Sequence, residues 1–203
     1  MQVAVIADQN LSDQFGYKNG LQVAHYNAVE AIITPPHIIF YLLDETTLPD
    51  VLPELRGFKC HVVVNAVCTT LQTLPVHFSR LNAWPGFLLR PIKEVSAREE
   101  DQAFLDEIFG LLGWQYQFVA DTPGLIAARI IAMIINEAWY AYTDGVSTQQ
   151  DIDLAMKLGT NYPYGPFEWG KKIGLDKIVT LLLTMAKENR RYAPAPLLLK
   201  QVD

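Results

Sequence analysis

Three short runs of apolar residues near the start of the chain constrain its fold more than any other feature. They are VAVIA at 3–7, HIIFYLL at 37–43 and HVVVNAV at 61–67. Runs of this length, rich in β-branched residues, indicate strands with both faces buried, as in a parallel sheet that helices cover on each side. Further short strands are expected at 22–27 and 114–121, so the first part of the chain is predicted to be α/β.

One amphipathic helix is predicted within this first part, at residues 97–114. Its expected buried stripe consists of Phe104, Leu105, Ile108, Leu111 and Leu112, with Gly113 as the stop. The segment before it, 75–91, is rich in Pro, Gly and aromatic residues. That composition predicts a loop or irregular edge structure.

The pattern changes at Asp121. Asp121-Thr122-Pro123 predicts a helix start, and 124–145 is apolar on nearly every face, with Arg129 and Glu137 as the exceptions. More helices are expected over 151–159 and 175–192. We therefore predict a domain over 1–120 and a second, all-α domain over 121–203.

Composition excludes several classes of function. The 203 residues include 16 Lys and Arg against 22 Asp and Glu, a formal net charge of −6, which argues against nucleic-acid binding. No apolar run approaches the ~20 residues that cross a bilayer, and the N-terminus lacks the basic start of a signal peptide. Cys60 and Cys68 suggest neither a disulfide framework nor a zinc site. We expect a cytoplasmic protein that binds neither nucleic acid nor membrane.

Four blocks of sequence in the second half carry a family resemblance. They are DTPGLIAARIIAMIINEA (121–138), DGVSTQQDIDLAMKLGTNYPYGPFEWGKKIGLD (144–176), RRYAPAPLLLK (190–200), and the VAD that leads into DTPG (119–124). This ordered set resembles the helical domain of the NAD-dependent 3-hydroxyacyl-CoA dehydrogenases, including 3-hydroxybutyryl-CoA dehydrogenase. The resemblance implies a shortened Rossmann-like parallel sheet followed by a helical domain like the C-terminal domain of 6-phosphogluconate dehydrogenase. The same blocks also serve as helix caps and turns.

The N-terminal half departs from the family where NAD would bind. Family members begin like VAVIGAGTMG, whose glycines let the backbone approach a pyrophosphate. This chain reads VAVIADQNLS, so that Ala7, Gln9 and Ser12 stand at the glycine positions, and Asp8 adds a negative charge. A carboxylate beside a phosphate costs on the order of 1–4 kcal/mol in a partly solvated site. We therefore expect no bound NAD.

The resemblance also implies positions for the reaction chemistry, in which a His oriented by a Glu removes the hydroxyl proton. LNAWPGFLLRPIKEV (81–95) retains that glutamate as Glu94 but sets Asn82 at the histidine, while VCTTL (67–71) sets Thr69 at the active-site serine. Ala128 stands at the family's Asn. An amide cannot act as a general base, a role that contributes roughly 10²–10⁴-fold to rate.

A rival alignment makes His77 the base, with His77-Phe78 as the family's H-F pair and a longer loop before Glu94. His25, His37 and His61 are interpreted as structural. The four histidines show no i,i+4 or H-x-E spacing, so no metal site is predicted.

Three functions follow from these positions. The first is a catalytically degenerate relative that forms a homodimer through the apolar helix 124–142. The second is a working dehydrogenase of fatty-acid or butyrate metabolism that binds NAD and uses His77. The third is a module that binds an acyl-CoA or another anion without turnover, with Arg80, Arg90 and Lys93 near the ligand.

Overall fold

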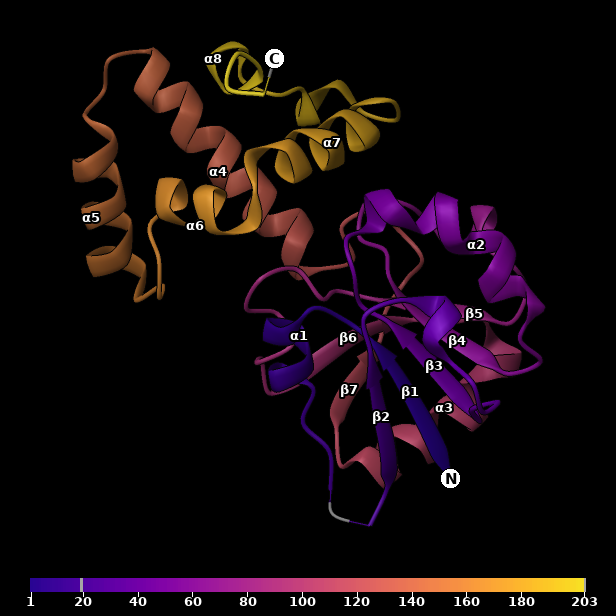
Figure 1. Ribbon diagram of the computed structural model, residues 1–203. Coiled ribbons are helices and arrows are strands. Elements are labelled where there is room, and N and C mark those ends of the chain that lie inside the picture. Colours follow the sequence, from indigo (N-terminus) through magenta and orange to yellow (C-terminus); the bar gives the residue numbers. More distant parts are fainter. Residues whose placement is uncertain (19, 203) are drawn as a thin grey trace. The chain divides into compact units, whose positions relative to one another are not determined.

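The computed structural model describes residues 1–18 and 20–202 and divides into two compact units, Met1–Leu125 and Ile126–Asp203 (Figure 1). The first unit is α/β and the second is all-α, which confirms the predicted fold class.

A seven-stranded sheet forms the centre of the α/β unit, in the order β2-β1-β3-β4-β5-β6-β7. The strands are β1 (Gln2–Ile6), β2 (Gln22–Tyr26), β3 (Ile38–Tyr41), β4 (His61–Asn65), β5 (Phe78–Leu81), β6 (Ile92–Ser96) and β7 (Gln115–Phe118). Strands β1 to β5 are parallel to one another, β6 is antiparallel to β5, and β7 is parallel to β6. The usual Rossmann order has a further strand outside β2, so this sheet is shortened at that edge.

Helices cover both faces of the sheet, as the apolar runs predict. On one face, Val5, Phe40 and Val63 pack with α1 (Gln9–Gln14) and α3 (Glu99–Leu112). On the other, Ile39 and Val64 pack with α2 (Leu48–Gly57) and the 3-10 turns η1 (Val29–Ala31) and η3 (Leu71–Thr73). The turn η2 (Glu45–Thr47) leads into α2.

Two details of the α/β unit correct the sequence-based expectations. The segment 75–91, predicted as loop or edge structure, contains β5, whose four residues are all buried inside the sheet. In α3 the ending at Gly113 is right, with φ of 76° there, but Phe104 and Leu111 are 38% and 44% exposed. Phe109 is buried in their place, because the face that meets the sheet is rotated from the predicted stripe.

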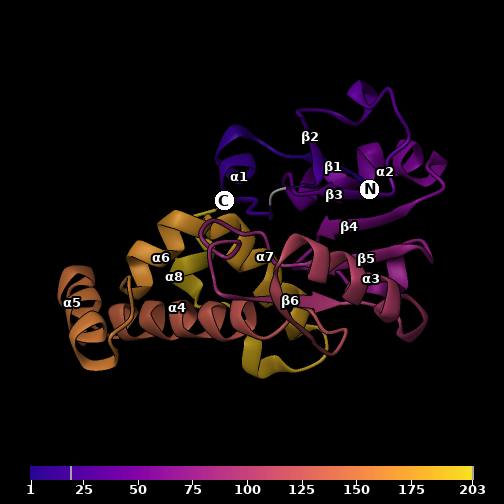
Figure 2. The same ribbon diagram turned by 90° about the horizontal axis from the view of Figure 1, so that it is seen from below.

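The helical unit consists of five α-helices and one 3-10 turn among the described residues. They are α4 (Ala127–Thr143), α5 (Gln149–Thr160), α6 (Pro166–Ile173), α7 (Leu175–Ala186), η4 (Arg190–Tyr192) and α8 (Pro196–Leu199). Figure 2 shows α4 from the side, with α6 and α8 along it and α5 beyond its C-terminal end.

The predicted helix start at Asp121 is wrong, because α4 begins only at Ala127. Gly124 and Leu125 have positive φ, 85° and 52°, which breaks a helix there. Residues up to Leu125 therefore group with the α/β unit, beyond the boundary expected at residue 120.

Candidate functional site

In open α/β sheets ligands bind outside the carboxyl ends of the strands, where the strand order reverses. Here that point lies between β1 and β3, with β4 and β5 beyond them. The buried Asn65 at the end of β4 ties this edge together: its Oδ1 accepts from Ala83 N at 3.0 Å and its Nδ2 donates to Leu43 O at 3.2 Å.

Asp8 follows β1 and caps the short helix α1 with its own carboxylate. Its Oδ1 accepts a hydrogen bond from Leu11 N at 2.8 Å. In a nucleotide-binding sheet this first turn would present its N–H groups to the pyrophosphate. Here one of those groups is already bonded to a negatively charged side chain.

Two acidic side chains that follow β3 also accept hydrogen bonds from backbone N–H groups. Glu45 accepts from Cys68 N at 3.0 Å and from Val67 N, so it holds the loop that follows β4. Asp44 accepts from Thr46 N at 3.0 Å. The switch point is therefore lined by carboxylates that bind the protein's own amides.

These residues do not fit the pyrophosphate of NAD. Ala7, Gln9 and Ser12 carry side chains where a close approach of the backbone to the phosphate requires glycine. The carboxylate of Asp8 repels a phosphate, and it already accepts the hydrogen bond from Leu11 N that a phosphate would need. The end of β2 carries Tyr26 and Asn27 and lacks the acid that usually binds the adenosine ribose.

Asn82 directly follows β5, and Glu94 lies in the neighbouring strand β6. The antiparallel register pairs Arg80 with Ser96 and Leu81 with Val95, and continuing it by one residue would set Asn82 opposite Glu94. Asn82 is 7% exposed, its Oδ1 accepts from Trp84 N at 3.1 Å, and its Nδ2 is buried with no hydrogen-bond partner. The structure thus brings together the two positions that the resemblance assigns to base and orienting carboxylate, with an amide in place of the base.

Thr69 and Ala128 occupy the other two positions implied by the resemblance. Thr69 lies in the loop after β4, and its Oγ1 is 2.8 Å from Thr73 Oγ1. Ala128 is fully buried in α4 and offers no polar atom.

His77 does not lie near Glu94. It precedes β5, whereas Glu94 faces the opposite end of that strand, and five positions of strand span about 16 Å. His77 neighbours His61, whose Nε2 is 2.9 Å from Ser79 Oγ. Burial, assisted by His77 and Arg98, lowers the pKa of His61 to about 4. The geometry does not support a His77–Glu94 pair.

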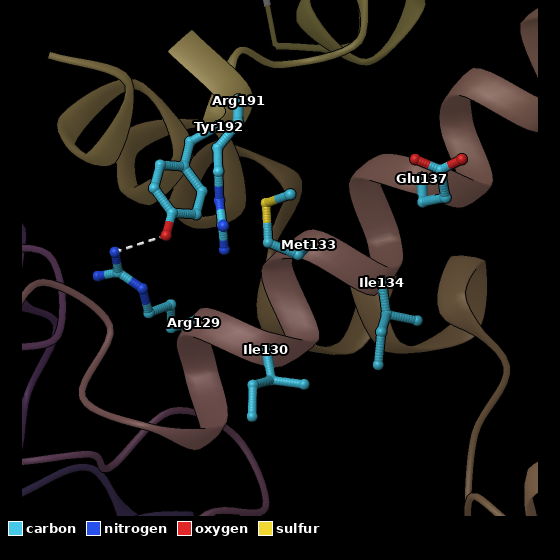
Figure 3. A pocket seen from close by; sticks show the side chains of 7 residues that line it. All are labelled: Arg129, Ile130, Met133, Ile134, Glu137, Arg191 and Tyr192. Carbon is cyan, nitrogen blue, oxygen red and sulfur yellow. Dashed lines mark hydrogen bonds between the residues drawn. The ribbon is translucent and has the colours of Figure 1, made fainter. Parts of the chain in front are cut away.

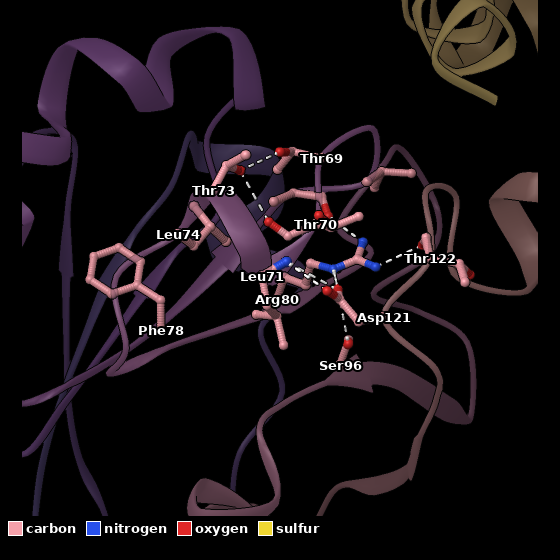
Figure 4. A network of polar contacts seen from close by, with 12 residues as sticks. Thr69, Thr70, Leu71, Thr73, Leu74, Phe78, Arg80, Ser96, Asp121 and Thr122 are labelled. Carbon is pink, nitrogen blue, oxygen red and sulfur yellow. Dashed lines mark hydrogen bonds and ion pairs between the residues drawn. The ribbon is translucent and has the colours of Figure 1, made fainter. Parts of the chain in front are cut away.

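An ion pair between the buried Arg80 and the partly exposed Asp121 lies at the centre of a polar network in the α/β unit (Figure 4). Arg80, in β5 and 0% exposed, donates to Asp121 Oδ1 at 2.7 Å, Thr122 O at 2.7 Å and Ala66 O at 3.0 Å. Asp121 also accepts from Leu71 N at 2.9 Å. Burial lowers the pKa of Arg80, while Asp121 acts in the opposite direction.

Arg80, Arg90 and Lys93, the three cations proposed for an anion site, each interact with different partners. Arg80 is enclosed in the Asp121 network. Arg90 lies 3.8 Å from Glu94 and over the ring of Phe87. Lys93 donates to Arg90 O at 2.8 Å and lies over the ring of Trp114.

The helical unit has a hollow of its own, about 380 Å³, between α4 and η4 (Figure 3). Arg129 Nη2 donates to Tyr192 OH at 2.8 Å, which lowers the pKa of Tyr192. Arg129 and Arg191 each lie 4.7 Å from the centre of the Tyr192 ring. Ile130, Met133 and Ile134 complete the apolar wall.

Residues 1–18 and 20–202 contain no group of three or more His, Cys, Asp or Glu side chains that could hold a metal ion. Over the same residues no helix combines the length and apolar character needed to cross a membrane, and no disulfide joins Cys60 to Cys68.

The fold defines a class: an α/β unit of Rossmann type followed by a helical unit. Comparison with known proteins is more specific. Residues 124–203 match the family model of the 3-hydroxyacyl-CoA dehydrogenase C-terminal domain. The chain resembles the 3-hydroxyacyl-CoA dehydrogenase family, most strongly in its helical unit.

Individual relatives carry names from the same family. The chain is 30% identical to 3-hydroxybutyryl-CoA dehydrogenase of Clostridioides difficile over 169 residues, which cover 81% of this chain and 59% of that protein. It is 49% identical to 3-hydroxyadipyl-CoA dehydrogenase of Escherichia coli over 82 residues, or 39% of this chain and 17% of the relative. The chain thus spans less than two thirds of the length of these relatives.

Solved structures share the fold. The crystal structure of (S)-3-hydroxybutyryl-CoA dehydrogenase from Ralstonia eutropha has a TM-score of 0.75 at 16% identity, covering 99% of this chain and 93% of that one. FadB2 of M. tuberculosis has a TM-score of 0.76 at 17% identity, covering 99% and 92%.

Sequence reasoning missed the roles of Glu45 and of the Arg80–Asp121 pair. The signal for Arg80 was available: it is the one charge in the strand-length run HFSRL, and a buried arginine requires a carboxylate partner. Glu45 carries no comparable signal, because its partners are backbone amides.

Proposed function

We propose that this chain is a catalytically degenerate 3-hydroxyacyl-CoA dehydrogenase-like protein that retains the family scaffold without NAD-dependent turnover. The observation that carries the proposal is the Asp8 carboxylate bonded to Leu11 N. A pyrophosphate at this turn would have to displace a charged cap and accept its repulsion.

The pair of Asn82 and Glu94 supports the same function. The amide of Asn82 can donate a hydrogen bond but cannot take a proton near neutral pH. A substrate hydroxyl beside it would therefore keep its proton, even with Glu94 on the neighbouring strand.

Titration with NAD and NADH, followed by tryptophan fluorescence, tests the proposal directly. We expect no saturable change, and no NADH-dependent reduction of acetoacetyl-CoA, under conditions in which the C. difficile relative is active. Saturable binding or steady turnover would overturn the proposal. If turnover were found, His77→Ala and Asn82→Ala would identify which position supports it.

The proposal includes a homodimer through α4. Ile130, Met133 and Ile134 of α4, together with Ile126 just before the helix, form one apolar stripe, in which Ile126 is 43% and Ile130 52% exposed. Arg129 lies near the start of α4 and Glu137 two turns later. Under two-fold antiparallel packing, each arginine faces the partner's glutamate, so the surface is complementary to itself.

Sedimentation equilibrium at micromolar concentration tests this part. The wild type should have the mass of a dimer and Ile130→Glu that of a monomer. The matched control Leu158→Glu, at a residue 79% exposed on α5, should remain dimeric. A monomeric wild type would contradict the dimer but not the degenerate site. A cytoplasmic location is also part of the proposal.

A further inference from the structure

A cavity of about 390 Å³ lies within the α/β unit, where the segment after α1 meets the end of α3 and the start of β6. Tyr17, Lys18, Leu88, Lys93, Leu112 and Trp114 contribute to its lining. None of these residues belongs to the Arg80–Asp121 network or to the Asp8 turn.

The charge of this cavity is opposite to that of the chain. Two lysines line it, and no described lining residue is acidic, although the chain carries a net charge of −6. The C-terminal end of α3 contributes roughly half a negative elementary charge, which is smaller than the two full positive charges. An anion is therefore attracted.

The side chain of Lys93 and the backbone of Lys18 are held in place. Lys93 Nζ donates to Arg90 O at 2.8 Å and lies 5.6 Å from the centre of the Trp114 ring. Burial lowers the pKa of Lys93, so an anion beside it would stabilise the charged form. Lys18 N donates to Leu112 O at 3.2 Å.

Gly113 makes room for Lys18. Its φ is 76°, and a Cβ built on it would come within 2.4 Å of Lys18 Cε. The Trp114 indole N–H donates to Gly16 O at 2.6 Å, which fixes the same segment against the end of α3. These contacts hold the backbone at Lys18 against the end of α3.

The two lysines favour a doubly charged ligand. A phosphate monoester, with a second pKa of about 6, is mainly a dianion near neutral pH, so its charge matches that of Lys18 and Lys93. A carboxylate carries only one negative charge.

We infer that this cavity binds a phosphate monoester carried on a short aliphatic chain. Lys18 and Lys93 hold the phosphate oxygens, and Leu89, which is 66% exposed, contacts the chain. The inference does not rest on the proposed function, since it involves neither the Asp8 turn nor Asn82.

The test uses n-butyl phosphate as the probe, with ¹⁵N-labelled protein and the Trp114 indole N–H signal as the reporter. We expect saturable binding that weakens with added salt, tighter than that of butyrate, and no binding of n-butanol. Lys18→Met and Lys93→Met should each weaken binding about tenfold, as expected for loss of a charged hydrogen bond. The control Lys59→Met, at an exposed lysine outside the cavity, should bind as the wild type does.

Absence of saturable binding up to about 10 mM, the range of the weakest specific affinities, would overturn the inference. So would equal effects of Lys59→Met and the two cavity variants. Butyrate binding as tightly as n-butyl phosphate would overturn the assignment to phosphate. Since the Lys18 side chain is exposed, Lys18→Met decides the matter even if Lys93→Met does not fold.

Discussion

The two units use their family-like residues differently. In the helical unit, Asp153 of the D-I-D block accepts from Phe167 N at 2.8 Å and Glu168 N at 3.1 Å of the G-P-F-E block. The motifs there bind one another and hold α5 against α6. In the α/β unit, Asp8 and Glu45 stand at the ligand edge of the sheet, yet they too bind the chain's own backbone.

This difference explains why sequence likeness and activity need not agree. The helical motifs are required by packing, so they persist whether or not any reaction occurs. The sheet of the α/β unit needs only buried apolar residues in its strands, so its fold survives changes at the nucleotide edge. Sequence similarity in the helical unit therefore indicates a shared fold. The residues at the edge of the sheet indicate which chemistry the protein can perform.

The largest expected effect is in the α/β unit, at the Arg80–Asp121 pair. Arg80→Met leaves the carbonyls of Ala66 and Thr122 without this donor, and Asp121 keeps Leu71 N and Ser96 Oγ as donors. Because Asp121 is 27% exposed, we expect about 3–4 kcal/mol, the lower part of the range for a broken buried pair. Urea unfolding followed by circular dichroism measures the loss. Arg90→Met, at a side chain 50% exposed, should change the free energy of unfolding by less than about 0.5 kcal/mol. A small effect of Arg80→Met would mean that the network is not structural.

The next effect is the pH dependence set by His61. Its pKa is about 4 in the folded chain against 6.5 for the unperturbed side chain, so between these values the unfolded state binds a proton that the folded state does not. The free energy of unfolding should therefore fall as the pH drops from 6.5 to 4, by about 3 kcal/mol from this group. The free energy of unfolding, measured by urea unfolding at several pH values, should depend less on pH in His61→Gln than in the wild type. The same pH dependence in both proteins would contradict the assignment of this effect to His61.

Much of the architecture could be predicted from sequence, since apolar periodicity is a local signal. The strands at 2–6, 38–41 and 61–65 and the stop at Gly113 are where the pattern indicates. β5 could not be predicted in this way, because a buried arginine and flanking prolines obscure its pattern. The prediction failed at Asp121 because the carboxylate bonds to Arg80, distant in sequence, instead of capping a helix.

The candidate site was predictable only in part. The alignment with the family set Asn82 beside Glu94, and the antiparallel register brings them together. Spacing alone could not exclude His77, because the direction of β6 relative to β5 decides which end of the strand Glu94 faces.

A smaller effect tests the packing of motifs in the helical unit. A Cβ at Gly165 would lie 2.4 Å from Asp153 Cα and Cβ, so Gly165→Ala should force α5 and α6 apart and cost roughly 1–3 kcal/mol. Gly159→Ala is the matched control: nothing lies within 4 Å of its Cβ, and alanine should stabilise α5 by up to about 1 kcal/mol. Thermal unfolding of both variants measures the difference, and equal melting temperatures would show that the motif is not a packing constraint.

The smallest effect separates the structural role of Asp8 from its charge. Asp8→Ala removes the cap of α1 and should cost about 1 kcal/mol, whereas Asp8→Asn keeps an acceptor for Leu11 N and should cost much less. Urea unfolding of the two variants measures the loss in the free energy of unfolding for each. If Asp8→Ala were as stable as the wild type, the fold would not need the carboxylate. The comparison between the two units, in which Asp8 binds the chain's own backbone at the edge of the sheet, would then not hold at this turn. Equal losses in both variants would instead mean that the negative charge, acting on the N-terminal end of α1, stabilises this turn more than the hydrogen bond does.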